Sequence, residues 1–298
     1  MMKNISLKTS TVNSSISSIL EELELLLDSS DLFYGHGSVN AKDEALALIL
    51  SVLKSDYPLD KDLLASKPSS DEFSRINNHL SERINTRKPM SYITGEAYFC
   101  GHRFFVDERV LIPRSPIAEM IHNQMQPWID MKNIRRVLEI GTGSGCIALS
   151  MAIEFPEIEV VASDISEPAL EVARLNRQDK NLVDKVELVH SDLFENISGS
   201  FDLIITNPPY VPDEVMRNLP IEYSFEPRQA LIAGNKGLDF ISRILQDAPP
   251  FLNQKGVLVI EAGVAAEELE RSKDLPFIWA VFENGGDGVA IIEAQHLS

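Results

Sequence analysis

The sequence predicts an α/β protein with a seven-stranded, mainly parallel sheet, preceded by a small helical domain. Apolar residues recur at helical spacing through the first third of the chain. From about Arg135 onward, short apolar runs alternate with helical patterns. A glycine-rich turn follows the first of these runs, as in α/β sheets that bind a ligand beyond their strand ends. The chain has 298 residues, enough for one large domain or two ordinary ones, and with 44% hydrophobic and 24% charged residues it has the composition of a globular protein.

The first third of the chain reads as helices whose apolar stripes face a core. The stripes lie in Ile16–Leu27, Ala45–Leu53 and Phe73–Ile84. Ser70 and Asp71 are the expected caps of the third helix, and Pro89 closes it. None of these stripes carries obvious chemistry. We expect a helical domain over residues 1–95.

A strand-like pattern follows between Tyr98 and Ile112. Aromatic and β-branched residues there stand among Gly101 and charged residues, as in a hairpin. Residues 96–112 are therefore expected to form a hairpin linker to a second domain, which spans residues 113–298.

Seven candidate strands lie in the second domain. They are Val137–Ile140, Val160–Ser163, Val186–Val189, Leu203–Thr206, Val257–Glu261, Trp279–Phe282 and Val289–Glu293. Helical patterns separate most of them, which predicts parallel strands with helices on both faces. The segment between the last two strands is too short for a crossover helix, so these two strands should pair antiparallel.

A glycine-rich loop connects the first strand to a helical segment that begins at Cys146. The loop consists of Gly141, Thr142, Gly143, Ser144 and Gly145. Glycines let the backbone turn tightly and approach a ligand closely. The third glycine comes one residue too early for the dinucleotide fingerprint G-x-G-x-x-G. Such a turn can bind a ligand, or it can simply pack a helix on a sheet.

Acidic residues follow the second and third strands. Asp164 lies about 20 residues past the glycines, where a carboxylate can accept hydrogen bonds from both hydroxyls of a ribose. Asp164 could instead cap the following helix. Asp192 and Leu193 follow the third strand, where a side chain can reach an adenine ring, although Asp192 could equally be a turn residue.

The fourth strand ends in the most specific motif of the chain, Asn207, Pro208, Pro209 and Tyr210. Two prolines must end the strand, and their fixed φ makes the loop stiff. The Asn207 side-chain oxygen and the Pro208 carbonyl can accept the two N–H groups of an amide, while Tyr210 packs over the flat group. If the other reactant is a methyl donor that is already activated, alignment of this kind is enough for methyl transfer to the amide nitrogen, and no strong base is required. The alternative is a structural turn with a buried tyrosine.

The overall charge and the few cysteines narrow the function classes. A formal net charge of −18 argues against contact with nucleic acid phosphates. It favours a basic protein partner, or serves only solubility. Cys100 and Cys146 are too few for a disulfide framework or a thiolate zinc site, and the histidines lack metal-ligand spacing, so we expect no metal. These features and the absence of a long apolar run favour a cytoplasmic protein without membrane contact.

The glycine loop, Asp164 and the segment Asn207–Tyr210 resemble class I, Rossmann-like methyltransferases that use S-adenosylmethionine to modify planar nitrogens. That group includes adenine methyltransferases of DNA and RNA. It also includes protein-glutamine methyltransferases related to the enzyme that modifies bacterial peptide release factors. The chain resembles the second group in having a helical N-terminal domain, a hairpin linker and a C-terminal catalytic domain. This resemblance implies methylation of a glutamine side-chain amide nitrogen (N5) in a protein.

Within that family, the chain more closely resembles the branch that acts on the L-three protein of the large ribosomal subunit. The resemblance lies in Phe33–Gly37, Cys100–His102, Val110–Ile117 and Asn284–Gly288. Release-factor enzymes usually follow the Pro-Arg pair with an acidic residue, threonine and glutamate, where this chain has Ser115, Pro116 and Ile117. A release-factor substrate stays the alternative.

The resemblance also implies roles by position. The cofactor would be bound by Glu139, Gly141, Thr142, Gly143, Ser144, Gly145, Asp164, Asp192, Leu193 and Asn207. The glutamine would be bound by Asn207, Pro208, Pro209 and Tyr210, with Asn207, Pro208 and Tyr210 catalytic. Arg114 lies in a shared motif whose role the resemblance does not define, and it could simply pair with a carboxylate of the catalytic domain. Tyr34 and His36 could read the partner protein, or could shape a turn at Gly35 and Gly37.

Other classes stay open at this point. An adenine methyltransferase would share the proline loop, since an exocyclic amine also offers two N–H groups, but it would need a basic track for the nucleic acid. A non-catalytic module would keep the fold and lose cofactor binding. A nicotinamide-dependent oxidoreductase is disfavoured by the glycine spacing.

Overall fold

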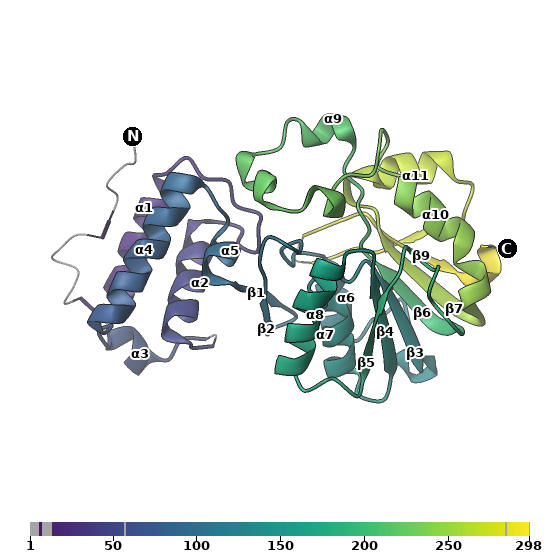
Figure 1. Cartoon of the computed structure of the whole chain (residues 1–298), viewed down its shortest axis with the longest axis horizontal. Helices are drawn as coiled ribbons and strands as arrows, with labels where there is room; N and C mark the ends of the chain where they lie inside the picture. The colour runs from purple at the N-terminus through teal and green to yellow at the C-terminus, as the bar shows by residue number, and fades with distance from the viewer. Residues whose placement is uncertain (1–5, 8–13, 57, 284, 298) are drawn as a thin grey trace. The chain divides into compact units, whose positions relative to one another are not determined.

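The computed structural model describes residues 6–7, 14–56, 58–283 and 285–297, and the chain divides into two compact units (Figure 1). The helical unit comprises Met1–Ala97 together with Pro220–Phe225. The sheet unit comprises Tyr98–Leu219 and Glu226–Ser298. Every helix in the described part of the chain is too short or too polar to cross a bilayer.

Three long helices build the helical unit, as the apolar stripes predict. They are α1 (Ile16–Asp28), α2 (Ala41–Leu53) and α4 (Ser70–Thr86), with two short helices, α3 (Lys61–Ala65) and α5 (Met90–Thr94). Leu23, Leu48 and Leu80 are fully buried in the shared core. The predicted cap of α4 was wrong by one residue: Ser69 is the N-cap, and it forms a reciprocal capping box with Glu72.

The helical unit contains a buried ion cluster that was not predicted from the sequence. Arg83 donates to Glu44 at 2.7 Å (Nε to Oε1), and both side chains are almost fully buried. Glu222, from the segment Pro220–Phe225, accepts from the Phe33 backbone N–H and from Arg87 Nε, at 2.9 and 3.0 Å. Burial opposes ionisation of Glu222, but these hydrogen bonds outweigh it and hold its pKa below the usual value. The cluster therefore fixes Pro220–Phe225 in this unit.

The segment around His36 forms a turn. Gly35 and Gly37 have φ values of 132° and 89°, which only glycine adopts readily. The buried ring of His36 lies 4.4 Å from the ring of Tyr223, centroid to centroid. Burial raises the pKa of Tyr34 to about 12. These observations favour the structural interpretation of this segment.

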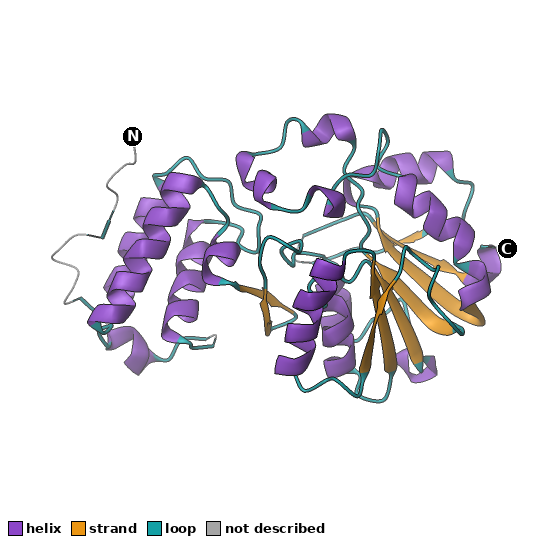
Figure 2. Ribbon diagram, viewed as in Figure 1, coloured by secondary structure: helices purple, strands orange, loops and turns teal. Residues whose placement is uncertain are grey.

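The sheet unit contains the seven-stranded sheet that the sequence predicts, in the order β5-β4-β3-β6-β7-β9-β8 (Figure 2). Its strands are β3 (Arg136–Ile140), β4 (Glu159–Asp164), β5 (Val186–His190), β6 (Phe201–Thr206), β7 (Leu252–Glu261), β8 (Ile278–Trp279) and β9 (Val289–Glu293). The first five are parallel, and β9 lies antiparallel to both β7 and β8. The prediction of an antiparallel final pair is confirmed, but β8 ends at Trp279 and not at Phe282.

Alternate residues along each central strand enter two separate cores, because successive side chains point to opposite faces. Val137 of β3 belongs to the core that α6 (Ile117–His122) and α7 (Cys146–Glu154) cover. Leu138 belongs to the opposite core, under α10 (Asp239–Asp247) and α11 (Ala266–Ser272). Helix α8 (Glu167–Asp179) packs along β4 and β5. Both faces of the sheet are therefore covered, as expected for parallel strands.

The expected hairpin is shorter than predicted. Its strands are β1 (Glu96–Phe99) and β2 (His102–Phe105), and residues 106–112 are not part of a strand. Val106, Val110 and Ile112 are buried, so their apolar pattern reflects packing of an irregular segment and not a longer strand. Asn284, within a segment that resembles the ribosomal-protein branch, lies outside the described residues.

Candidate active site

The glycine loop leaves the carboxyl end of β3 and enters α7. Gly141, Gly143 and Gly145 have φ values of 74°, 54° and 83°, so each takes a conformation that favours glycine. The backbone N–H groups of Gly141 and Thr142 both donate to the Ser163 carbonyl, at 2.8 and 2.9 Å. The loop is thus fastened to the end of β4.

Asp164 holds the glycine loop from the side of β4. Its carboxylate accepts from the Gly143 and Ser166 backbone N–H groups, both at 2.8 Å. The cap of α8 is Ser166, so Asp164 is not the helix cap that the alternative interpretation required. Burial raises the pKa of Asp164, although these hydrogen bonds oppose the shift.

Glu139, on β3, also contacts the glycine loop. Its Oε2 accepts from the Thr142 hydroxyl at 2.5 Å and from the Ala148 backbone N–H at 2.9 Å. Only 2% of Glu139 is exposed, and burial raises its pKa to about 8. Two acidic side chains therefore position the loop, Asp164 through the Gly143 backbone N–H and Glu139 through the Thr142 hydroxyl.

The proline loop lies beside the glycine loop because their strands are neighbours. Ile140 of β3 pairs with Thr206 of β6, so Gly141 and Asn207 are the next residues of adjacent strands. The Thr206 hydroxyl donates to the Ile140 carbonyl at 2.9 Å. The two motifs, more than sixty residues apart in sequence, thus meet at one edge of the sheet.

Both loops line one cavity of about 260 Å³, near the lower end of the roughly 300 to 1,000 Å³ range of small-molecule pockets. The predicted site residues that line it are Glu139, Gly141, Thr142, Gly143, Ser144, Asp164, Asp192, Leu193, Asn207, Pro208 and Pro209. Gly145 and Tyr210 do not. A side chain on Gly145 would meet Leu149 at 3.1 Å, so this glycine serves helix packing.

The cavity also has walls that the sequence analysis missed. They are Arg109, Val110, Leu111, Pro113, Arg114 and Ser115, then Ile147, Ile165, Ser166 and Ala169, and finally Pro227, Gln229, Ala230 and Phe240. The first set follows the hairpin, and the last set follows the proline loop by about twenty residues. Val110–Ile117 resembles a family motif, but its place at the cavity depends on the tertiary fold and no local pattern predicts it.

Tyr210 is half-buried in the core under α10 and α11, and its hydroxyl donates to Glu261 at 2.9 Å. Asp192 forms an ion pair with Arg243 at 3.1 Å. Arg114 donates to both oxygens of the buried carboxylate of Glu226, at 2.6 and 2.8 Å. The expectation that Arg114 pairs with a carboxylate is therefore confirmed.

The sheet order, the glycine loop and the proline loop define a class I methyltransferase, the enzyme class that the motifs predict. The family described as methyltransferase small domain matches residues 123–222. The chain is 40% identical to the ribosomal protein uL3 glutamine methyltransferase of Francisella tularensis, over 91% of this chain and 87% of the relative. It is 41% identical to the enzyme of the same name from Neisseria gonorrhoeae, over 88% of both chains.

The chain belongs to the family of ribosomal protein uL3 glutamine methyltransferases. Family membership confirms an S-adenosylmethionine-dependent enzyme and the branch that the sequence resembles. Among solved structures, a methyltransferase from Pyrococcus furiosus is 21% identical, with a TM-score of 0.47 over 64% of this chain and 88% of that one.

Proposed function

We propose that the chain transfers a methyl group from S-adenosylmethionine to the side-chain amide nitrogen of a glutamine in uL3, in the cytoplasm. The observation that carries the proposal is the single cavity lined by both the glycine loop and Asn207-Pro208-Pro209. Membership of the uL3 enzyme family supports the substrate.

The residues of the cavity fit the methyl donor. A side chain on Gly143 would meet no atom within 4 Å, so glycine leaves open space where the backbone faces the cavity. Glu139, Asp164 and Asp192 line the same cavity, where their carboxyl oxygens can accept hydrogen bonds from ribose hydroxyls. When bound, S-adenosylmethionine supplies an electrophilic methyl group on its sulfonium.

The proline loop supplies the alignment. An amide nitrogen is a weak nucleophile because its lone pair is delocalised into the carbonyl. The Asn207 side-chain oxygen and the Pro208 carbonyl accept its two N–H groups and direct the nitrogen toward the methyl group. These contacts strengthen as the nitrogen loses its planarity, so they lower the barrier instead of merely binding the substrate.

The helical unit is the proposed substrate-recognition domain. The sequence predicts this domain as residues 1–95, joined by the linker 96–112 to a catalytic domain of residues 113–298. Leu25 and Val39 are large apolar residues that are 70% and 80% exposed on this unit, so they are the residues with which we test contact with the substrate protein. Replacing either by serine should raise KM for uL3 and leave cofactor affinity unchanged. Leu175→Ser, on an exposed position of α8, is the matched control. Unchanged KM in both variants would contradict this role.

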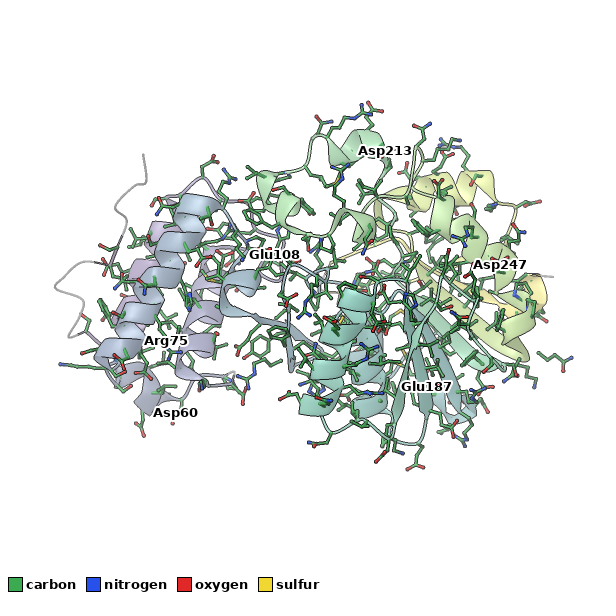
Figure 3. The ribbon with its side chains drawn as sticks, viewed as in Figure 1. Asp60, Arg75, Glu108, Glu187, Asp213 and Asp247 are labelled. Atoms are coloured by element: carbon green, nitrogen blue, oxygen red, sulfur yellow. The ribbon has the colours of Figure 1, made fainter. Side chains whose placement is uncertain are left out.

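The net charge of −18 suits a basic partner such as a ribosomal protein. Figure 3 shows acidic side chains at labelled positions of the sheet unit, including Glu187, Asp213 and Asp247. Association with uL3 should therefore slow as the salt concentration rises, since salt screens exposed charges. An association rate independent of salt would argue that the acidity serves only solubility.

A transfer assay with labelled S-adenosylmethionine tests the proposed function. Purified uL3, release factors and nucleic acid are offered in parallel, and the labelled residue is mapped by mass spectrometry. We expect label on one glutamine of uL3, abolished when that glutamine becomes asparagine. Label on release factors would keep the reaction and change the substrate, and label only on adenine would overturn the proposal.

A further inference from the structure

A buried carboxylate lies beside the proline loop and has no role in the proposed mechanism. Glu261 is the last residue of β7, and its neighbour Ile260 pairs with Thr206 of β6. Glu261 and Asn207 therefore follow paired residues of adjacent parallel strands, at the same edge of the sheet. Only 4% of Glu261 is exposed.

Both oxygens of Glu261 are occupied by hydroxyl donors. The Tyr210 hydroxyl donates to Oε1 at 2.9 Å, and the Ser115 hydroxyl donates to Oε2 at 2.5 Å. The Ser115 oxygen in turn accepts from the Ile117 backbone N–H at 3.2 Å, which fixes its orientation. The network joins three segments that are remote in sequence and ends on the last residue of the proline loop.

Two glycines confine Tyr210 from other sides. Any side chain on Gly263 would collide with the Tyr210 ring, and one on Gly237 would collide with the Tyr210 carbonyl. Gly263 is itself fixed by its N–H bond to the Gly288 carbonyl, at 3.2 Å. The position of Tyr210 is therefore restrained through its hydroxyl, its ring and its backbone at once.

We propose that Glu261 and Ser115 are positioning residues, which hold Tyr210 by its hydroxyl and so keep the proline loop, with Asn207 and Pro208, in place at the cavity. This inference rests on the proposed function. Glu261 accepts the hydrogen bond of the Tyr210 hydroxyl, so this hydroxyl is engaged within the protein and restrains the end of the proline loop. A misplacement of about 1 Å in such a group can cost on the order of 100-fold in rate.

Full-length variants test the network. Glu261→Leu keeps side-chain bulk and removes both acceptors, whereas Glu261→Gln keeps one acceptor and a donor that the hydroxyls can accept. We expect Glu261→Leu to lower kcat on uL3 by roughly 10- to 100-fold, and Glu261→Gln to restore it to within about threefold of the wild type. Affinity for S-adenosylmethionine, measured by calorimetry, should change less than about threefold in both.

A double-mutant cycle separates positioning from a merely structural role. Tyr210→Phe removes the same hydroxyl bond, so Tyr210→Phe with Ser115→Ala should be no slower than the slower single variant. This cycle decides the proposal even if Glu261→Leu does not fold. Asp202→Asn is the control, because Asp202 is a partly buried carboxylate at the opposite end of β6 that accepts from the Arg135 and Arg136 backbones.

The outcomes are distinct. Losses that multiply in the cycle, or a Glu261→Leu enzyme with normal kcat, would overturn the positioning role. A Glu261→Leu enzyme whose thermal midpoint falls while kcat stays normal, as expected for Asp202→Asn, would do the same. If the wild type itself leaves uL3 unmodified, the proposed function fails, and that result is seen before any variant is compared.

Discussion

The two sides of the cavity are held in different ways. On the glycine-loop side, Asp164 accepts from the Gly143 backbone N–H and Glu139 accepts from the Thr142 hydroxyl, and both acidic residues lie within 25 residues of the loop. On the proline-loop side, Glu226 and Glu261 bind side chains of residues more than 50 or 100 positions away. The first side is built locally, while the second depends on assembly of the whole sheet. Substitutions should therefore separate into those that weaken cofactor binding and those that slow turnover.

The largest expected effect is on turnover. Asn207→Ala removes an acceptor that acts in the transition state, so kcat should fall by at least about 100-fold. Calorimetry should show cofactor affinity within a few-fold of the wild type, since Asn207 is only one of many lining residues. Near-normal turnover would overturn the assigned role of Asn207.

The next effect falls on the cofactor. Asp164→Ala removes the carboxylate that holds the Gly143 N–H, and hydrogen bonds to charged groups contribute about 1.5 to 3 kcal/mol. Affinity for S-adenosylmethionine should fall by roughly 10- to 100-fold, with kcat at saturating cofactor much less affected. Glu187→Gln, an exposed carboxylate on β5, is the matched control and should bind normally. Equal binding by both variants would contradict this division of the site.

A smaller effect is expected at the glycine loop itself. Gly143→Ala places a methyl group in the open space at the cavity and keeps a left-handed φ, at a cost of roughly 1 to 2 kcal/mol in stability. Cofactor affinity should also fall, because the methyl group occupies space at the cavity. Thermal unfolding without cofactor measures the loss of stability, and the further stabilisation by added cofactor measures the affinity. A variant that loses stability but retains full affinity would place the cofactor elsewhere in the cavity.

Glu139 tests the glycine-loop side through pH. Its folded pKa is raised to about 8 from the usual 4.5, so the folded state retains a proton that the unfolded chain releases. This contribution to stability is complete below pH 4.5 and is lost as pH rises toward 8. Glu139→Gln lacks this proton, so denaturant unfolding should show the wild type losing stability relative to the variant between pH 5 and 8. A constant difference across that range would contradict the raised pKa.

The locally built side is also the side that the sequence predicted best. Periodicity located the strands, and glycine spacing located the loop, because both are properties of short contiguous segments. Ser115, Glu226 and Glu261 were missed, since each acts through a partner that only the folded sheet brings near. The hairpin was predicted too long for a related reason. Val106 and Val110 are buried, but the apolar pattern that they follow also occurs in irregular segments that pack against a core.

The segment Pro220–Phe225 has a consequence for engineering. It packs in the helical unit, although the residues before and after it belong to the sheet unit. The backbone therefore passes from one unit to the other three times, and Glu222 holds its segment through Arg87 and the Phe33 backbone. A graft of residues 1–95 onto a related catalytic domain would leave this segment facing a surface that did not evolve with it. If the helical unit reads the substrate, as proposed, exchange of target specificity between relatives requires three junctions, one after Ala97 and one on each side of Pro220–Phe225.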